Sequence, residues 1–437
     1  MTEQHPLAET AVRLGRAGND LASSRLAETP LFQAMLQAGT RHIYADTADV
    51  EELRSTIGTD DDAIRAEVDG NTANQPLVHR VVDRILEAGD AEGWLEALEE
   101  APGEASFEEL APWLYAVVCG RVGGGIVAAY AAGRPWEVSL QLHMALSHRP
   151  DEARRVGRAI RRMVPQAFVK VPFRPDEPSA FLIARDLERE GIPVNFTSTF
   201  SARQAVAAAM VSDVTRTNIF MGRLNQGFDA DLLGEHVDLE AQRAVARRRN
   251  DDGVKTQLIV ASVHDWRTFV HTAGCDVYTV PCEVLSNFLQ QGEVAPEDIT
   301  SQLETSYEDR LGIDAAASDK VGMDHIARLW RVEPELIEFL RELRRDTAFL
   351  DDADGDALFQ RFDDAGFGDI FHAPDARDRQ ELDQGKLPDL DGRLIGRVPL
   401  DTHYSLLANA DFERYQAKID EAMAKHAGAA AGHAASS

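Results

Sequence analysis

The chain has 437 residues, of which 44% are hydrophobic and 27% charged, a composition that supports a large folded core. Asp and Glu total 74 against 45 Lys and Arg, which gives a formal net charge of −29 at pH 7. Such a surface repels phosphate backbones and anionic lipids, so nucleic acid and membrane are disfavoured as partners.

The N-terminus lacks the apolar stretch of a signal peptide, and we expect no apolar run as long as a membrane span, which predicts a cytoplasmic protein. Six lysines stand against 39 arginines. This bias fits either GC-rich coding or a surface adapted to high salt. The three cysteines, Cys119, Cys275 and Cys282, have neither CxxC spacing nor a histidine at metal-ligand spacing. We therefore expect reduced, buried thiols and no metal site.

Residues 1–40 are predicted to form an N-terminal helical segment. From residue 41 to 310, short β-rich runs alternate with amphipathic helices. The expected strands are His42–Thr47, Ala66–Thr72, Glu137–His143, Phe168–Phe173, Pro193–Phe200, Thr217–Leu224, Gln257–Val263 and Val277–Cys282. This alternation favours an α/β fold of the (β/α)8 barrel class over an open doubly wound sheet, since no glycine-rich turn follows the first strand.

The remainder of the chain is predicted to be a C-terminal helical extension. Residues 311–426 are acidic, and Pro334 precedes a helical stripe of apolar residues: Leu336, Phe339, Leu340 and Leu343. Residues 427–437 are Ala, Gly and Ser with one histidine, which predicts a disordered tail.

Lys170 is the most informative residue, because it is the only lysine in the first 254 positions and lies in the middle of an apolar strand. Alternation directs Val169 and Val171 toward the covering helices, so Phe168 and Lys170 point into the barrel. Burial disfavours the charged ammonium, and a neutral amine is a nucleophile that forms Schiff bases with carbonyls. The alternative is a buried structural ion pair.

Neighbouring strands add polar groups to the same interior. Their inward positions carry Tyr44 and Asp46, then Ser139, Gln141 and His143, then Asn195, Thr197 and Thr199. A barrel without a site fills this space with Val, Ile and Leu. We therefore expect these side chains, taken together, to serve chemistry.

Several motifs within residues 41–290 resemble those of the transaldolase family. They are Asp46-Thr47-Ala48-Asp49, Asp69-Gly70-Asn71-Thr72-Ala73-Asn74-Gln75-Pro76, Phe168-Val169-Lys170-Val171-Pro172, Gly191-Ile192-Pro193-Val194-Asn195-Phe196-Thr197, Phe200-Ser201, Phe220-Met221-Gly222-Arg223 and Ala273-Gly274-Cys275-Asp276. The resemblance implies a (β/α)8 barrel with a Schiff-base lysine on the fourth strand, where Lys170 falls.

The resemblance also implies a role for each matched residue. Lys170 resembles the imine-forming nucleophile, and Asp46 the acid/base that takes the proton of the hydroxyl next to the cleaved bond. Asn74 and Asn195 resemble the amides that hold substrate hydroxyls. Thr197 resembles the group that positions the catalytic water, and Arg223 resembles a phosphate anchor.

Three positions depart from the family pattern. Gln141 replaces the usual glutamate, as in the fructose-6-phosphate aldolase branch, and glutamine can orient a water but cannot accept its proton. Asn218 replaces a serine near the substrate. Ser262 and His264 stand where the family has Ser-x-Arg, a second phosphate contact. Phe220, Asn195 and Ser201 match transaldolase rather than the aldolase branch.

The sequence therefore predicts an enzyme that transfers a dihydroxyacetone unit between sugar phosphates through an imine on Lys170, with no metal or organic cofactor. One alternative is an aldolase, or a family member that acts on a non-phosphorylated sugar. Another is an inactive barrel that binds sugar phosphate. The expected partner is a small sugar or sugar phosphate, and a homo-oligomer is left open.

Overall fold

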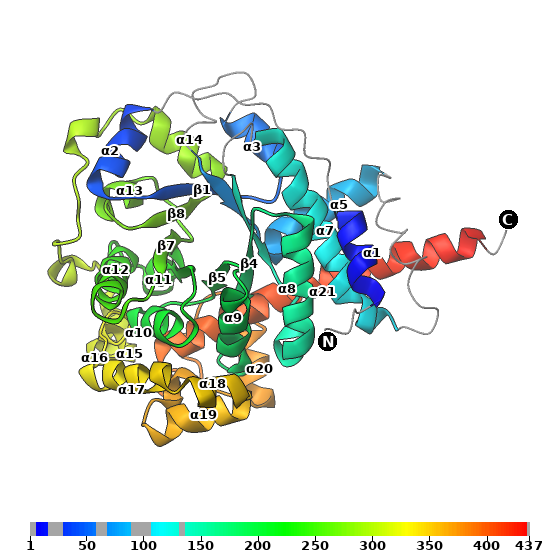
Figure 1. The fold of residues 1–437 in the computed structure, drawn as a ribbon. Coiled ribbons are helices and arrows are strands. Elements are labelled where there is room, and N and C mark those ends of the chain that lie inside the picture. The colour runs from blue at the N-terminus through cyan, green and yellow to red at the C-terminus, as the bar shows by residue number, and fades with distance from the viewer. Residues whose placement is uncertain (1–5, 16–28, 58–67, 89–105, 131–135, 435–437) are drawn as a thin grey trace.

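The computed structural model describes residues 6–15, 29–57, 68–88, 106–130 and 136–434 (Figure 1). Eight parallel strands close a barrel in sequence order. They are β1 (His42–Asp46), β2 (Gly70–Thr72), β3 (Glu137–Gln141), β4 (Ala167–Pro172), β5 (Val194–Thr197), β6 (Arg216–Phe220), β7 (Gln257–Ala261) and β8 (Val277–Val280). The predicted (β/α)8 barrel is confirmed.

Most strands end earlier than the sequence pattern suggests, and the difference is largest for β5 and β6. β5 stops at Thr197 rather than Phe200 because Ser198 adopts a positive φ of 66°, which takes the backbone out of the extended region. β6 stops at Phe220, and helix α11 (Met221–Phe228) begins at the next residue. Both early ends lie at the carboxyl edge of the barrel, where loops and helix starts carry functional side chains.

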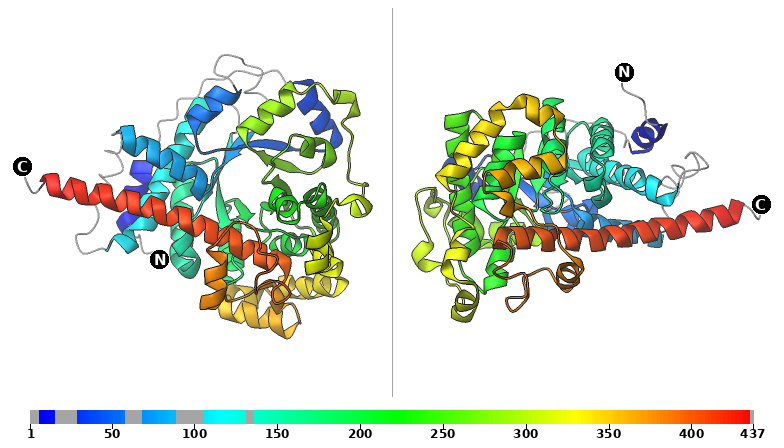
Figure 2. Two further views of the ribbon diagram at one scale, coloured as in Figure 1. Left: turned by 180° about the vertical axis from the view of Figure 1, so that it is seen from behind. Right: turned by 90° about the horizontal axis from the view of Figure 1, so that it is seen from below.

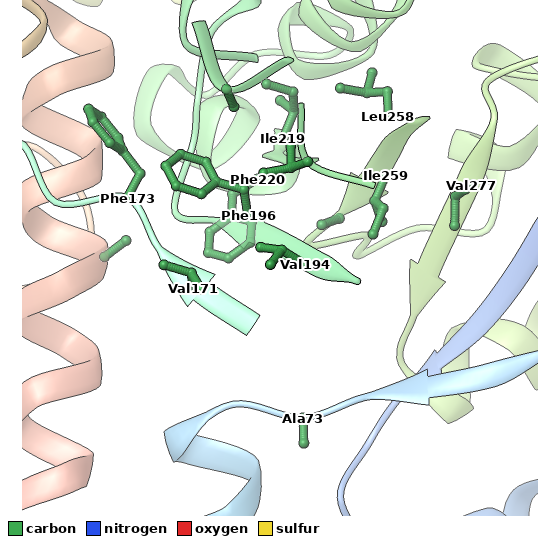
Figure 3. Packing of buried hydrophobic residues seen from close by; sticks show 14 of the residues in the cluster. Ala73, Val171, Phe173, Val194, Phe196, Ile219, Phe220, Leu258, Ile259 and Val277 are labelled. Carbon is green, nitrogen blue, oxygen red and sulfur yellow. The ribbon is translucent and has the colours of Figure 1, made fainter. Parts of the chain in front are cut away.

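The helices of the barrel region cover its outer face. They are α1 (Pro6–Gly15), α2 (Pro30–Ala38), α3 (Val50–Ile57), α5 (Gln75–Ala88), α7 (Phe107–Tyr130), α8 (Pro150–Met163), α9 (Ser179–Arg189), α10 (Ala202–Ala207), α11, α12 (Leu233–Asp252), α13 (Arg267–His271) and α14 (Cys282–Gln290). α8 buries one stripe of its surface, which contains Ala153, Val156, Ile160 and Met163. Figure 3 shows buried hydrophobic residues of β4 to β8 that belong to the same hydrophobic core.

Helix α7 is apolar on all sides, which is typical of a helix that is covered on all sides. By length and composition it could cross a membrane over Phe107–Ala129, so the expectation that no apolar run is long enough is wrong for this segment. In the fold, 89% of its most apolar window is buried, and α7 packs against α1, α8 and β3. Gly123 permits the close approach to β3, since a Cβ there would lie 3.0 Å from Leu140 Cδ1.

The C-terminal extension is helical, as predicted. It contains α15 (Ala315–Val321), α16 (Met323–Ala327), α17 (Pro334–Arg345), α18 (Thr347–Asp352), α19 (Gly355–Asp364), α20 (Ala376–Leu382) and α21 (Leu400–Ala434). In α17, Leu336, Leu340 and Leu343 are buried. The helix α21 continues to Ala434, where the sequence suggested a disordered tail from residue 427. The backbone is helical over 427–434 because alanine has the highest helix propensity.

Helix α21 lies across the carboxyl end of the barrel (Figure 2). Its residue Asn409 donates from Nδ2 to the carbonyl of Phe173 at 2.7 Å, just after β4. Figure 3 shows the ribbon of α21 beside Phe173. Gln416 accepts from Gln75 Nε2 at 3.3 Å, after β2, and Asp420 pairs with His143 Nε2 at 3.1 Å, after β3. The extension therefore covers the edge at which a barrel of this class carries its site.

One buried ion pair fixes the start of α21. The carboxylate of Asp401 accepts from Arg203 Nε at 2.7 Å and from Arg203 Nη2 at 2.8 Å. Ser201 Oγ donates to the same carboxylate at 2.6 Å. Both partners follow β5, so this contact holds the extension against the barrel. The three cysteines are free and buried, as expected.

Candidate active site

Lys170 lies in the middle of β4 and points into the barrel, with 2% of its surface exposed. Its Nζ donates to the carbonyl of Ala73 at 3.4 Å. Burial lowers the pKa of Lys170 from its usual 10.5 to about 8, and the negative charge of Asp46 opposes the shift. A substantial fraction of this amine is therefore neutral near pH 8 and able to attack a carbonyl carbon.

Asp46 ends β1 and supplies the carboxylate of the site. Its Oδ1 accepts from Thr72 Oγ1 at 2.8 Å, and that hydroxyl also lies 2.6 Å from Thr279 Oγ1. Burial raises the pKa of Asp46, while Lys170 and the Thr72 hydrogen bond pull it down. A carboxyl group with a raised pKa can both accept and return a proton, which is the requirement for an acid/base.

Polar groups surround Lys170 on the neighbouring strands. Gln141 on β3 and Asn195 on β5 are the register partners of Lys170. Asn195 Nδ2 donates to Ser139 Oγ at 3.1 Å. Several buried polar atoms have no hydrogen-bond partner among the described residues: Gln141 Oε1, Asn195 Oδ1, Thr197 Oγ1, Asn218 Oδ1 and Asn218 Nδ2. Buried polar atoms are rarely left unpaired, so this cluster is suited to bind hydroxyl groups or water.

The interior of the barrel at the amino ends of the strands is filled by a cluster of side chains around Arg216. Arg216 on β6 donates from Nη1 to Glu137 Oε2 at 2.7 Å, and the hydroxyl of Tyr44 bonds to the same carboxylate. The guanidinium lies 4.4 Å from the centre of the Phe168 ring and 4.9 Å from that of Tyr44. Because this cluster fills the amino end, we expect a substrate to reach Lys170 from the carboxyl end.

A cavity of about 210 Å³ opens at that end. Of the residues predicted from the sequence, it is lined by Asp46, Asn74, Lys170, Asn218, Phe220, Arg223, Ser262 and His264. Gln141, Asn195 and Thr197 are not in its lining but are fully buried on the strands that flank β4. Ser198 and Ser262, which follow β5 and β7, have φ angles of 66° and 60°, and such backbone strain clusters at functional sites.

The cavity is also lined by residues that were not predicted as site residues, among them Thr279, Lys386, Asp411 and Phe412. Thr279 on β8 is a polar residue between Tyr278 and Val280 in an inward position, a signal that could have been found in the sequence. Lys386, Asp411 and Phe412 come from the C-terminal extension. Phe412 packs edge-on against Phe220 with ring centres 6.4 Å apart. No pattern in the extension signals that these three residues reach the barrel.

Arg223, the predicted phosphate anchor, is paired with the extension. Its Nη2 donates to Asp411 Oδ2 at 3.0 Å, while its Nη1 is buried without a hydrogen-bond partner in the part of the chain that the structure describes. His264 Nε2 lies 3.2 Å from Ser262 Oγ. Desolvation and then the charge of Arg223 lower the pKa of His264 from its ordinary 6.5, so this imidazole is neutral at pH 7.

A larger cavity of about 500 Å³ lies beside the first, between α11 and α13. The two share His264, but the larger one contains neither Lys170 nor Asp46. We therefore assign the candidate site to the smaller cavity. Among the described residues, no group of three or more His, Cys, Asp or Glu side chains is placed to hold a metal ion.

A family model described as Transaldolase/Fructose-6-phosphate aldolase matches residues 43–327. A "Probable transaldolase" of Nitrosopumilus maritimus is 36% identical over 138 residues, which cover 31% of this chain and 57% of the relative. A "Transaldolase" of Acidobacterium capsulatum is 24% identical over 289 residues, 64% of this chain and 83% of the relative. A "Probable transaldolase" of Herpetosiphon aurantiacus is 28% identical over 254 residues, which cover 57% of this chain and 87% of the relative.

The barrel and these matches together define an enzyme of the aldolase and transaldolase class. The chain belongs to the transaldolase/fructose-6-phosphate aldolase family. The matched region ends with α16, so α17 to α21, with Lys386 and Asp411, lie outside it.

Proposed function

We propose that this enzyme transfers a dihydroxyacetone unit from a ketose phosphate to an aldehyde acceptor through an imine on Lys170. The observation that carries the proposal is the pairing of a buried lysine, whose pKa lies at about 8, with a carboxylate in the same cavity. An amine that is partly neutral can attack a ketone, and a nearby carboxylate can move the proton that carbon–carbon cleavage requires.

The reaction begins when the neutral Nζ of Lys170 adds to the ketone carbon and forms a carbinolamine. Loss of water gives a protonated imine, which attracts the electron pair of the adjacent carbon–carbon bond. Asp46 takes the proton of the hydroxyl on the next carbon, the bond breaks, and an aldehyde leaves. The enamine that remains on Lys170 then attacks an acceptor aldehyde, and the same steps in reverse release the new ketose.

The other polar groups hold the substrate and water in this scheme. The unpaired atoms of Asn195 and Asn218 are suited to sugar hydroxyls, and Asn74 lines the cavity together with Asn218. Thr197 and Gln141 flank β4 and can orient the water that is lost and regained at the imine. Arg223 and His264 lie at the outer end, with Phe220 and Ser262.

An aldolase that releases dihydroxyacetone is the second candidate function, and Gln141 is the observation that favours it. By resemblance, the fructose-6-phosphate aldolase branch carries glutamine at this position, and its neutral amide can orient a water but cannot accept its proton. An inactive sugar-phosphate-binding barrel accounts less well for Lys170 beside Asp46, since binding alone does not require the cost of burying an amine and a carboxyl group together.

A transfer assay separates these functions. Fructose 6-phosphate is incubated with the enzyme, with and without an aldose phosphate acceptor, and the products are quantified. Transfer predicts a new ketose in amounts equal to the released three-carbon aldehyde, and only when the acceptor is present. Free dihydroxyacetone without acceptor would identify an aldolase. Lys170→Met should abolish both, whereas Lys320→Met, a change at an exposed surface pair with Asp391, should not.

A further inference from the structure

The outer end of the cavity is built from two distant parts of the chain. Arg223 comes from α11 in the barrel, whereas Lys386 follows α20 in the C-terminal extension. Both contact the same oxygen of Asp411: Arg223 Nη2 at 3.0 Å and Lys386 Nζ at 3.4 Å. The two cationic nitrogens are therefore no farther apart than the sum of these distances, a span that two oxygens of one phosphate group can bridge.

The loop that carries Lys386 is held in place by α21. Arg414, one turn after Asp411, donates to the carbonyls of Leu382 at 3.4 Å and Gly385 at 3.2 Å. It also donates to Asp411 Oδ1 at 3.2 Å. Lys386 Nζ lies 5.5 Å from the centre of the Tyr415 ring on the same helix, within range of a cation–π contact. Lys386 is thus fixed at the cavity although its side chain is 52% exposed.

The cations around Asp411 outnumber the single negative charge of its carboxylate. Three cations, Arg223, Lys386 and Arg414, surround this carboxylate, whose side chain is 1% exposed. Arg223 Nη1 is buried and has no hydrogen-bond partner among the described residues, so one donor is left for a ligand. An anionic ligand would complete this arrangement, whereas a neutral hydroxyl would not balance the charge.

We propose that Lys386 is a specificity-determining residue, which together with Arg223 binds the phosphate of the sugar substrate. Asp411 and Arg414 are positioning residues that hold the two cations toward the cavity. His264, neutral at pH 7, lies beside this site without supplying its second charge. This inference rests on the proposed function. It assigns to Lys386 of the extension the second phosphate contact, for which the family has an arginine at the position of His264.

The test compares fructose 6-phosphate with fructose as donors at fixed ionic strength. Lys386→Met keeps the aliphatic stem and removes the charge. It should raise KM for the phosphorylated donor about tenfold, the scale of one charge-assisted hydrogen bond, and leave its kcat and the kinetics with fructose nearly unchanged. Inorganic phosphate should become a correspondingly weaker inhibitor of fructose turnover. Lys386→Arg should restore both properties.

Lys425→Met is the matched control, because Lys425 is an exposed lysine of α21 that does not line the cavity. It should leave KM and phosphate inhibition unchanged. The inference is overturned if Lys386→Met affects both sugars equally, affects neither, or matches Lys425→Met. Borohydride trapping of Lys170 with dihydroxyacetone, which carries no phosphate, distinguishes the two proposals. An adduct with unchanged phosphate discrimination rejects the Lys386 assignment alone, and the absence of any adduct in the unmodified enzyme rejects the proposed function.

Discussion

Lys170 on β4 and Asp46 on β1 interact inside the barrel, and each opposes the shift that burial imposes on the pKa of the other. Burial drives both groups toward their neutral forms, whereas their mutual attraction favours the charged pair. The balance leaves the pKa of Lys170 at about 8. A partly neutral amine therefore lies beside a carboxyl group whose pKa is raised, and the proposed reaction requires both a nucleophile and an acid/base.

The first prediction concerns the pH dependence of imine formation. Only the neutral amine reacts, so the single-turnover rate of imine formation should rise with pH and level off above about 8, well below the ordinary lysine pKa of 10.5. Asp46→Asn removes the charge that stabilises the ammonium. The pKa of Lys170 should then fall, and the rising part of the profile should move to lower pH. Turnover should fall by about 10²–10⁴. An unmoved profile would show that Asp46 does not act on Lys170.

The second prediction uses Gln141, the register partner of Lys170. Gln141→Glu adds a carboxylate of the same shape to the buried cluster. It should stabilise the ammonium and move the rising part of the same pH profile upward, opposite to the effect of Asp46→Asn. The measurement is the rate of imine formation between pH 6 and about 10. A shift in the same direction for both variants would contradict the arrangement described above.

The third prediction concerns the attachment of α21. Asp401→Asn breaks a buried pair with Arg203, although Arg203 keeps its contact with Asp369 Oδ1 at 2.8 Å. The free energy of unfolding should fall by on the order of 3 kcal/mol at pH 7, measured by urea denaturation. Asp391→Asn at the exposed Lys320 pair is the control and should cost less than about 1 kcal/mol.

The loss of unfolding free energy caused by Asp401→Asn should itself depend on pH. Burial raises the pKa of Asp401, but Arg203 and the hydrogen bonds from Ser201 and Thr402 outweigh it, so the net shift is downward. A carboxylate with a lowered pKa contributes stability above its ordinary value of 3.8 and loses it as the pH falls. The gap between the unmodified protein and Asp401→Asn should therefore close below that pH. A constant gap would assign the loss to packing rather than charge.

The fourth prediction concerns salt. A net charge of −29 makes the folded state repel itself, and salt screens this repulsion over a Debye length that falls from about 10 Å at 0.1 M to about 3 Å at 1 M. The melting temperature should rise as KCl is added. A flat or falling curve would favour coding bias as the reason for the scarcity of lysine.

The barrel and its interior polar groups could be predicted from the sequence because a strand alternates its side chains between two faces. That rule needs only neighbouring residues in the sequence, and it predicts Lys170, Asn195 and Thr197 in the interior without any knowledge of tertiary contacts. The ends of β5 and β6 were predicted too far along the chain, since Ser198 leaves the extended region and α11 starts at Met221 without an intervening loop.

The contribution of the extension could not be predicted in the same way. Asp411 reaches Arg223 across 188 positions of sequence, and this contact depends on how α21 lies over the barrel. Charged residues on an acidic helix have no local pattern that separates a buried partner from a solvated one. Asp401 and Asp411 are buried in ion pairs, yet in sequence they resemble the many exposed carboxylates of the extension.

The proposed function depends on the imine on Lys170, and this imine can be trapped chemically. The protein is incubated with fructose 6-phosphate, reduced with borohydride, digested and examined by mass spectrometry. We expect one added three-carbon fragment, located on the peptide that contains Lys170 and absent from Lys170→Met. An adduct on any other lysine would contradict it, as would no adduct with fructose 6-phosphate, fructose or dihydroxyacetone.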